Sequence, residues 1–417
     1  MARIAREAQF SPDEIVIVHV VNRAVRRVFL MGQDKYSGIN FDYRKVWFER
    51  RLEQLAAFFG IDLLAFSILS NHIHLILRQR PDLVQSWDDT EVARRWLMLC
   101  PKKRNKDGSA CCPTEAELNS IRDDDSKLRE IRSRLSDISW WMRLMCQTIA
   151  QRINREDLAT GKVFENRYRA VRLLDEASLL ACAAYVDLNP IRAAMAETLE
   201  QSDYTSVQRR IQAVKLQLER TCLGGTAGIA TQAVDSNATT NEVDIQQTEQ
   251  TQQSAALLVN PTISTNSTSE SEVDQVVIDQ AAADQLDQAA IEPDRILAPV
   301  ELNELRDAVR LQPSQSGCRC SDRGFLNMTA AEYIELLDWT ARTLTPGKRG
   351  TTPADAPSIF ERMKLGISVE SWCELVGNFG RLFKIVAGKP HVVDAHRGKV
   401  RPKRFKLSRE ARQLLTA

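Results

Sequence analysis

Residues 63–77 read LLAFSILSNHIHLIL. The two apolar runs on either side of Ser70-Asn71 are typical of two antiparallel strands joined by a tight turn. The second run carries His72 and His74, two positions apart. Because side chains at i and i+2 project from the same face of a strand, the two imidazoles are predicted to lie side by side.

The segments around this hairpin alternate between strand and helix patterns. In chain order we predict a strand at 15–22, a helix at 44–59, the hairpin strands at 63–69 and 72–77, helices near 88–99 and 123–135, a helix at 139–155, a short strand region at 161–174 and a helix at 176–188. Asn189-Pro190 ends the last helix, since a residue before proline is disfavoured in the α region. The order β-α-β-β-insert-α-β-α, with the insert at about 82–136, predicts an α/β (α+β) fold with a mostly antiparallel sheet and packed helices.

Charge is distributed unevenly along the chain. The 417 residues carry 56 Lys+Arg and 55 Asp+Glu, a net charge of +1, which taken alone argues against a nucleic-acid partner. By segment, the net charge is +5 over 1–220, −12 over 221–294 and +8 over 295–417. The near-neutral total is therefore a cancellation between two basic segments and an acidic one.

These differences predict three parts. Residues 1–220 form the α/β domain, and residues 221–295 form an acidic disordered linker, because the stretch is rich in Thr, Gln, Ser, Asn and Asp and has few groups to bury. Residues 296–417 form a small helical module with a basic tail. The helices of this module are predicted at 297–311, 329–344, 358–364 and 368–386, and the basic run at 396–409.

The nine cysteines are odd in number and show no repeated CxxC spacing, which favours free thiols in a reducing compartment. The first residues contain no apolar signal region, and no stretch approaches the ~18 apolar residues that a membrane span needs. We therefore expect a cytoplasmic protein without a membrane partner.

A candidate catalytic constellation combines the histidine pair with Tyr185 and Asn189. Two neighbouring imidazoles are suited to bind one divalent cation, and the alternative is a pair of surface histidines. Tyr185 and Asn189 are four residues apart, so on a helix a phenol and an amide would point toward one site. A phenol is a competent nucleophile beside a cation, although a tyrosine on an Ala-rich helix can also be part of the core.

Three motifs in order resemble one known family. NHIHLIL at 71–77, GKVFENRYRAVRLLDEASLLACAAYVDLNPIRAAM at 161–195 and Tyr-Thr-Ser at 204–206 look like the single-tyrosine HUH transposases, and most like the REP-associated tyrosine transposase group. The resemblance covers about residues 12–210. The insert at about 82–136 departs from the pattern of the family. The linker and the C-terminal module lie outside the resemblance.

The resemblance implies a ferredoxin-like domain and a DNA transposase or endonuclease activity. It implies that His72, His74 and Asn189 bind a divalent metal, Mg²⁺ or Mn²⁺, and that Tyr185 attacks the scissile phosphate of single-stranded DNA. The products are a 5′-phosphotyrosine and a free 3′-OH, and the reverse reaction with another 3′-OH rejoins strands.

Basic and aromatic side chains near these motifs are candidates for contact with single-stranded or hairpin DNA, because phosphates need charge and unstacked bases need aromatic surfaces. The candidates are Arg23, Arg26, Arg27, Arg78, Lys162, Asn166, Arg167, Tyr168 and Arg169. Solvated surface charge is the alternative for any single arginine. His19 lies mid-strand and is expected to be either a buried structural histidine or a group that supports a metal ligand. The protein is expected to be a monomer or a homodimer.

Two competing functions remain. A replication initiator or relaxase-type nickase uses the same chemistry, but it more often brings a helicase domain, and the chain contains no GxxxxGK[ST] phosphate loop. The other is a protein that binds hairpin DNA without cleaving it.

Overall fold

The structure is a computed structural model that describes residues 6, 9–25, 29–34, 37–106, 108–165, 167–231, 292–302, 311–344, 367–399 and 405–415. The chain divides into two compact units, one made of Met1–Val214 and Pro293–Ala417 and the other of Lys215–Glu292. Most of the predicted linker, residues 232–291, lies outside the described residues.

A five-stranded sheet forms the centre of the first unit, in the order β2-β3-β1-β4-β5. The strands are β1 (Ile17–Arg23), β2 (Ile61–Ile68), β3 (His72–Gln79), β4 (Arg169–Leu173) and β5 (Val386–Ala387). The first four pair antiparallel, and β5 adds to β4 in parallel. The predicted mixed α/β fold with a ferredoxin-like antiparallel sheet is confirmed, and the parallel strand from the C-terminal segment extends it.

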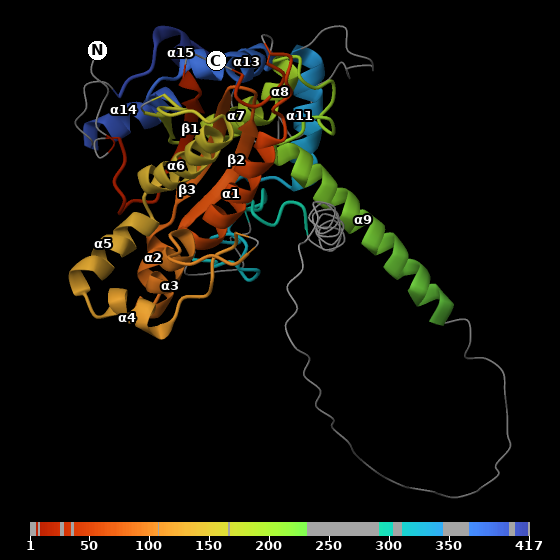
Figure 1. Cartoon of the computed structure of the whole chain (residues 1–417). Helices are drawn as coiled ribbons and strands as arrows, with labels where there is room; N and C mark the ends of the chain where they lie inside the picture. The colour runs from red at the N-terminus through yellow and green to blue at the C-terminus, as the bar shows by residue number, and fades with distance from the viewer. Residues whose placement is uncertain are drawn as a thin grey trace, which may run out of the picture. The chain divides into compact units, whose positions relative to one another are not determined.

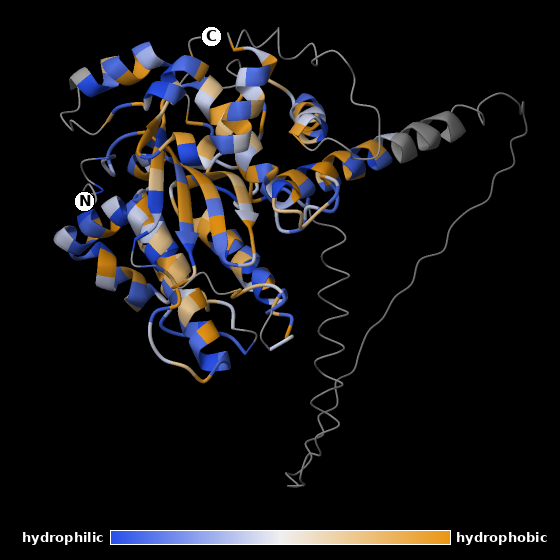
Figure 2. Ribbon diagram, turned by 90° about the horizontal axis from the view of Figure 1, so that it is seen from above, coloured by the Kyte–Doolittle hydropathy of each residue, from blue (hydrophilic) through white to orange (hydrophobic). Residues whose placement is uncertain are grey.

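Two helical layers cover the sheet, and each has its own apolar core. On one face α1 (Arg44–Phe58) and α6 (Ile138–Glu156) pack on β1 side chains such as Val18 and Val20. On the other face α7 (Glu176–Asp187) packs on side chains such as Ala65 and Ile76. The strands are mainly hydrophobic along their length, as expected for a sheet buried on both sides (Figure 2).

The insert is a cluster of helices at one end of the unit (Figure 1). The predicted helices near 88–99 and 123–135 are present as α3 (Asp89–Leu99) and α5 (Asp125–Leu135). Two shorter ones were not predicted, α2 (Pro81–Ser86) and α4 (Glu115–Arg122). A Thr114–Glu117 capping box begins α4, so the sequence did contain a signal for that helix.

The C-terminal segment differs in part from its prediction. Its described helices are α11 (Ala330–Leu344), α13 (Val369–Leu382), α14 (Pro390–Lys399) and α15 (Arg409–Leu414). The helix predicted from residue 297 is wrong over 297–302, which forms isolated bridges to the sheet and to Leu326. The rest of that helix from 303 to 310, and the helix predicted at 358–364, lie outside the described residues.

The C-terminal segment packs within the same unit as residues 1–214 instead of standing apart. Asp62 and Arg78, paired across β2 and β3, form a buried ion pair of 2.7 Å. The Arg78 guanidinium also donates to the carbonyl oxygens of Gly324 and Arg323 at 2.8 and 2.6 Å, and Ser321 Oγ donates to Asp62 at 2.7 Å. A pair of sheet residues thus bonds to the segment 321–324, Arg78 to its backbone and Asp62 to the Ser321 hydroxyl.

α9 (Ser206–Thr231) begins in the first unit and extends into the second. No helix among the described residues has the length and apolar character needed to cross a membrane. The eight cysteines whose side chains the structure describes are free, in agreement with the prediction of free thiols.

Replacing Arg78 with Met should lower the free energy of unfolding by about 3 kcal/mol or more, because it leaves the Asp62 carboxylate buried without its closest cation. Urea denaturation followed by circular dichroism measures this. The matched control is Arg342→Met, which removes a partly exposed pair with Asp338 on α11 and should cost less than about 1 kcal/mol. Equal effects of the two changes would contradict the structural role of Arg78.

Candidate active site

Three histidines on two neighbouring strands share one face of the sheet. β1 runs antiparallel to β3 with Val21 opposite His74, so His72 and His74 project beside the alternate residues of β1. The His72 and His74 ring centroids are 4.9 Å apart. His19 stacks on His74 with centroids 5.2 Å apart, and its Nε2 lies 2.9 Å from His74 Nδ1. The third histidine is therefore a member of the cluster.

Tyr185 reaches this cluster from α7. The helix begins with a capping box between Asp175 and Ser178 and places Tyr185 in its last turn. The Tyr185 ring meets His74 edge-on at a centroid distance of 5.5 Å and His19 at 5.9 Å. The structure therefore brings together the phenol and the histidine pair, which are more than 100 residues apart in the sequence.

Asn189 lies just after α7, where α8 (Asn189–Arg192) begins with Pro190 in its first turn. Its side chain is largely buried, and its Nδ2 has no hydrogen-bond partner among the described residues. Since a half-turn of the amide exchanges nitrogen and oxygen, this position can also present Oδ1. Buried polar atoms in proteins normally have a hydrogen-bond partner, so the unpaired Asn189 amide is a position where a ligand is expected.

The histidines are held in their neutral form. Burial, and secondarily the Arg23 guanidinium, lowers the pKa of His72 to about 4. Burial and Arg169 lower the pKa of His19 to about 3, and burial together with the other two histidines holds the pKa of His74 well below its ordinary value. Neutral imidazole is the form that binds a metal ion.

The donor set fits a divalent cation in part. Asn71 Oδ1 lies 2.7 Å from His72 Nδ1, and accepting its proton would leave Nε2 of His72 as the metal-binding nitrogen. His74 Nε2 is buried without a hydrogen-bond partner among the described residues. In the described part of the chain no group of three or more His, Cys, Asp or Glu side chains is arranged to hold a metal ion. The predicted set contains two such residues and Asn189, so an amide would have to be the third ligand.

Helix α13 covers the site. It kinks at Asn378, and the next two residues meet the cluster. The Phe379 ring lies 6.0 Å from His19 and 5.8 Å from Tyr185 between centroids. Gly380 packs so closely that a Cβ at this position would lie 2.7 Å from the Tyr185 hydroxyl oxygen. Sequence reasoning assigned no role to this helix.

Two arginines tie α13 to the site. Arg169 donates to the Gly380 carbonyl oxygen at 3.1 Å, and Arg192 donates to the Gly377 carbonyl oxygen. The Arg192 guanidinium also lies 4.8 Å from the centroid of the Tyr185 ring, within range of a cation–π contact. Arg169, a predicted DNA contact, therefore uses at least one of its N–H donors in a hydrogen bond to α13.

The other predicted DNA-binding residues are in different settings. Lys162 and Arg167 are exposed, and Arg23 and Tyr168 are partly buried. Arg78 is only 5% exposed, and its bonds to Asp62 and two carbonyls make it a structural residue, not a surface contact. Arg26, Arg27 and Asn166 lie outside the described residues.

The comparisons with known proteins yield one structural similarity. No protein-family model matches the chain, and no curated protein matches it. The chain is distantly similar to a solved structure described as a REP-associated tyrosine transposase bound to a REP hairpin. That similarity has a TM-score of 0.29 and 11% sequence identity, and it covers 51% of this chain and 86% of that chain. A similarity this low does not indicate the function of this chain.

Acidification should destabilise the metal-free protein through its histidines. Because the pKa of His19 is about 3 in the folded chain against 6.5 ordinarily, the unfolded state binds more protons between these values. The stability contributed by neutral His19 is present above pH 6.5 and is lost as the pH falls toward 3. Between about pH 7 and pH 5, the expected loss from His19 alone is about 2 kcal/mol.

Denaturation in EDTA at both pH values measures this loss, and His19→Gln should remove it. His391→Gln, which changes an exposed histidine on α14, is the control and should retain the wild-type pH dependence. A pH dependence unchanged in His19→Gln would contradict the burial of a neutral imidazole.

Proposed function

We propose that the protein cleaves and rejoins single-stranded or hairpin DNA through a covalent 5′-phosphotyrosine at Tyr185, with help from a divalent metal. The observation that carries the proposal is the convergence of Tyr185 on the His72–His74 pair, with 5.5 Å between the Tyr185 and His74 ring centroids. A nucleophile and neutral imidazoles on one sheet face are the groups that such a transfer needs.

In this mechanism the chain supplies three functions. His72, His74 and Asn189 would hold the cation, Mg²⁺ or Mn²⁺, which when bound would neutralise charge on the scissile phosphate. Arg23 and Arg169 add positive charge beside the histidines, to whose pKa values they contribute. The Tyr185 oxygen loses its proton and attacks phosphorus. The bond to the 3′ oxygen breaks, and this oxygen takes up a proton and leaves as a 3′-OH. The phosphotyrosine preserves the bond energy for rejoining, so no nucleotide cofactor is required.

A second candidate is a protein that binds hairpin DNA without cleaving it. It is favoured by the close packing of Gly380 on the Tyr185 hydroxyl, because a phosphate must occupy space next to that oxygen. The two candidates differ in whether a covalent adduct forms.

The deciding experiment incubates the full-length protein with a 3′-labelled hairpin oligonucleotide and Mn²⁺, since the strand on the 3′ side of the cleaved bond stays attached to Tyr185. Wild type should form a protein–DNA adduct stable to denaturing electrophoresis, and Tyr185→Phe should form none, since it lacks the attacking oxygen. His74→Ala should lower adduct formation by about 100-fold or more through loss of a metal ligand.

The control is Tyr43→Phe, which changes an exposed tyrosine before α1, outside the cluster, and should retain the adduct. If Tyr185→Phe still formed the adduct, another residue would be the nucleophile. Binding of the hairpin without any adduct in wild type would select the second candidate.

Gly380→Ala tests whether α13 sets the position of the nucleophile. The added methyl would lie 2.7 Å from the Tyr185 hydroxyl, so the phenol must shift. Because about 1 Å of misplacement can cost about 100-fold in rate, we expect adduct formation to fall by about 10- to 100-fold. Quantified gels over time measure the rate.

Gly377→Ala is a matched control on the same helix. Its new methyl would meet only Leu344 Cδ2 at 3.7 Å, an ordinary contact, so its rate should equal that of wild type. A faster reaction in Gly380→Ala would instead mean that α13 obstructs Tyr185.

A further inference from the structure

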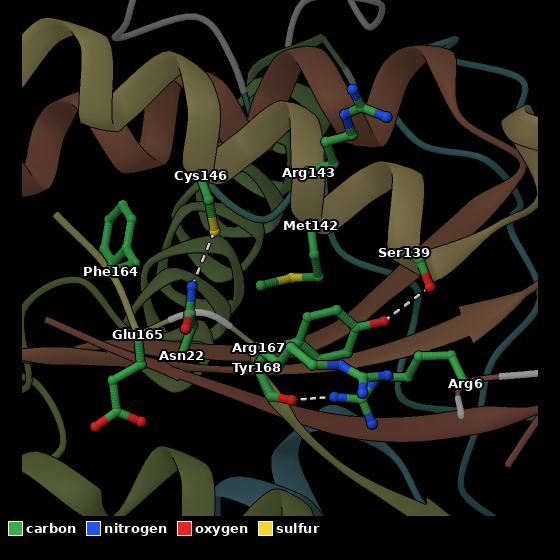
Figure 3. A pocket seen from close by; sticks show the side chains of 10 residues that line it. All are labelled: Arg6, Asn22, Ser139, Met142, Arg143, Cys146, Phe164, Glu165, Arg167 and Tyr168. Atoms are coloured by element: carbon green, nitrogen blue, oxygen red, sulfur yellow. Dashed lines mark hydrogen bonds between the residues drawn. The ribbon is translucent and has the colours of Figure 1, made fainter. Parts of the chain in front are cut away.

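Figure 3 shows a pocket of about 330 Å³ that Asn22 of β1 lines. The register of β1 on β3 puts Asn22 on the sheet face opposite to the histidines. The floor of the pocket is Asn22. Residues of α6, among them Met142 and Cys146, form the roof, and Phe164 and Tyr168 from the segment before β4 form a wall. Nothing in the proposed cleavage chemistry uses this pocket.

The pocket and the histidine site lie on opposite faces of the sheet, at the same part of β1 and β3. Asn22 is paired with Ile73, the residue between His72 and His74. Because alternate residues of a strand face opposite sides, Asn22 projects into the pocket while the histidines project toward Tyr185. A single strand crossing this end of the sheet could therefore present its backbone to one site and a base to the other.

The interior of the pocket suits a flat, partly polar ring. Phe164 and Met142 are largely buried apolar side chains, and the Tyr168 hydroxyl lies 3.0 Å from Ser139 Oγ, which keeps the ring in place. The volume is in the range of small-molecule sites and is sufficient for a purine. Aromatic and apolar walls of this kind accept an unstacked base.

The floor of the pocket can identify the base by hydrogen bonding. Asn22 is 4% exposed, its Nδ2 donates to Cys146 Sγ at 3.0 Å, and its Oδ1 accepts from the Arg23 amide at 3.1 Å. One N–H of the amide and one lone pair of its oxygen remain for a ligand. In base recognition an asparagine amide pairs in this way with N6 and N7 of adenine.

The rim carries the charge that a phosphate needs. Three arginines and one carboxylate, that of Glu165, line the pocket. The Arg6 guanidinium stacks on the Tyr168 ring at 4.1 Å, and Arg143 stacks on the Trp140 ring at 4.6 Å. Arg6 also donates to Gln9 Oε1 and to the Tyr168 carbonyl oxygen, so its guanidinium is held in place and contributes positive charge at the rim.

We propose that this pocket binds one unstacked adenine of a single-stranded nucleic acid, at a nucleotide beside the phosphate that reaches the histidines. The inference rests on the proposed function for the identity of the substrate as single-stranded DNA. It adds a base-specificity site on the other face of the sheet, with Asn22 as the residue that reads the base.

The test measures binding in a protein that does not cut, the full-length Tyr185→Phe variant. The probes are fluorescein-labelled single-stranded homo-oligomers of dA, dC and dT of about ten nucleotides, and the readout is fluorescence anisotropy at constant salt. The dA probe should bind about 5- to 100-fold more tightly than dC or dT, the range expected for one base held in a pocket.

Two additional substitutions address the pocket directly. Asn22→Leu keeps the side-chain volume and removes the polar edge, and Ser139→Trp fills the pocket from its partly exposed rim. Both should reduce dA binding to the level of dC and dT. Gln147→Trp adds the same bulk to an exposed position of α6 and should leave the preference for dA unchanged.

Equal binding of the three probes, or a dA preference that survives Ser139→Trp, would overturn the proposal. The outcome is separable from that of the cleavage test. A preference for dA that depends on Asn22, without adduct formation by wild type, would support the pocket and reject the nuclease, whereas adduct formation without base preference would reject the pocket alone.

Discussion

The antiparallel register between β1 and β3 is the constraint on which both sites depend. With Val21 opposite His74 and Asn22 opposite Ile73, the histidines face α7 and Asn22 faces α6. A shift of the pairing by one residue would turn every β1 side chain to the other face of the sheet. His19 would then lose its contact with His74, and Asn22 would leave the pocket. The apolar alternation that buries Val18 and Val20 under α1 and α6 is what prevents this shift.

The position of Tyr185 depends on chain segments far from it in sequence. Asp187, two residues further along α7, is fully buried and accepts from the Tyr333 hydroxyl at 2.7 Å and from the Val207 amide at 3.1 Å. Burial raises the pKa of this carboxyl, while the hydrogen bonds from Ser206 and Tyr333 oppose that rise. The end of α7 is thus bonded to α9 and α11, and α13 packs over the phenol itself. The C-terminal segment is therefore part of the structure that holds the candidate nucleophile.

The parts of the fold that follow from local patterns could be predicted from the sequence. The hairpin and the helices at α1 and α6 have apolar patterns that match their burial, and i, i+2 spacing placed His72 beside His74. Helix α7 is buried on all sides, and its end followed from Asn189-Pro190. The close contact of His19 with His74 required the register of β1 on β3, which no local signal specifies. The same holds for Phe379 and Gly380, because nearly 200 residues separate them from Tyr185 and because their contact depends on a kink at Asn378. At 297–302 the apolar residues gave a helical pattern, but the backbone instead forms bridges to β2 and Leu326.

The net charge of each segment does not show which arginines are available to a ligand. Five described arginines, at positions 44, 51, 78, 80 and 210, are almost fully buried. Arg78 and Arg80 lie near Asp62, and Arg210 donates to the carbonyls of Leu64 and Ala298, so these charges stabilise the fold. The positive potential at the histidine site comes instead from Arg23 and Arg169 at the strand ends. Those two guanidiniums help to lower the pKa values of the histidines, so the same charges that would attract a phosphate also favour the neutral imidazoles that a cation requires.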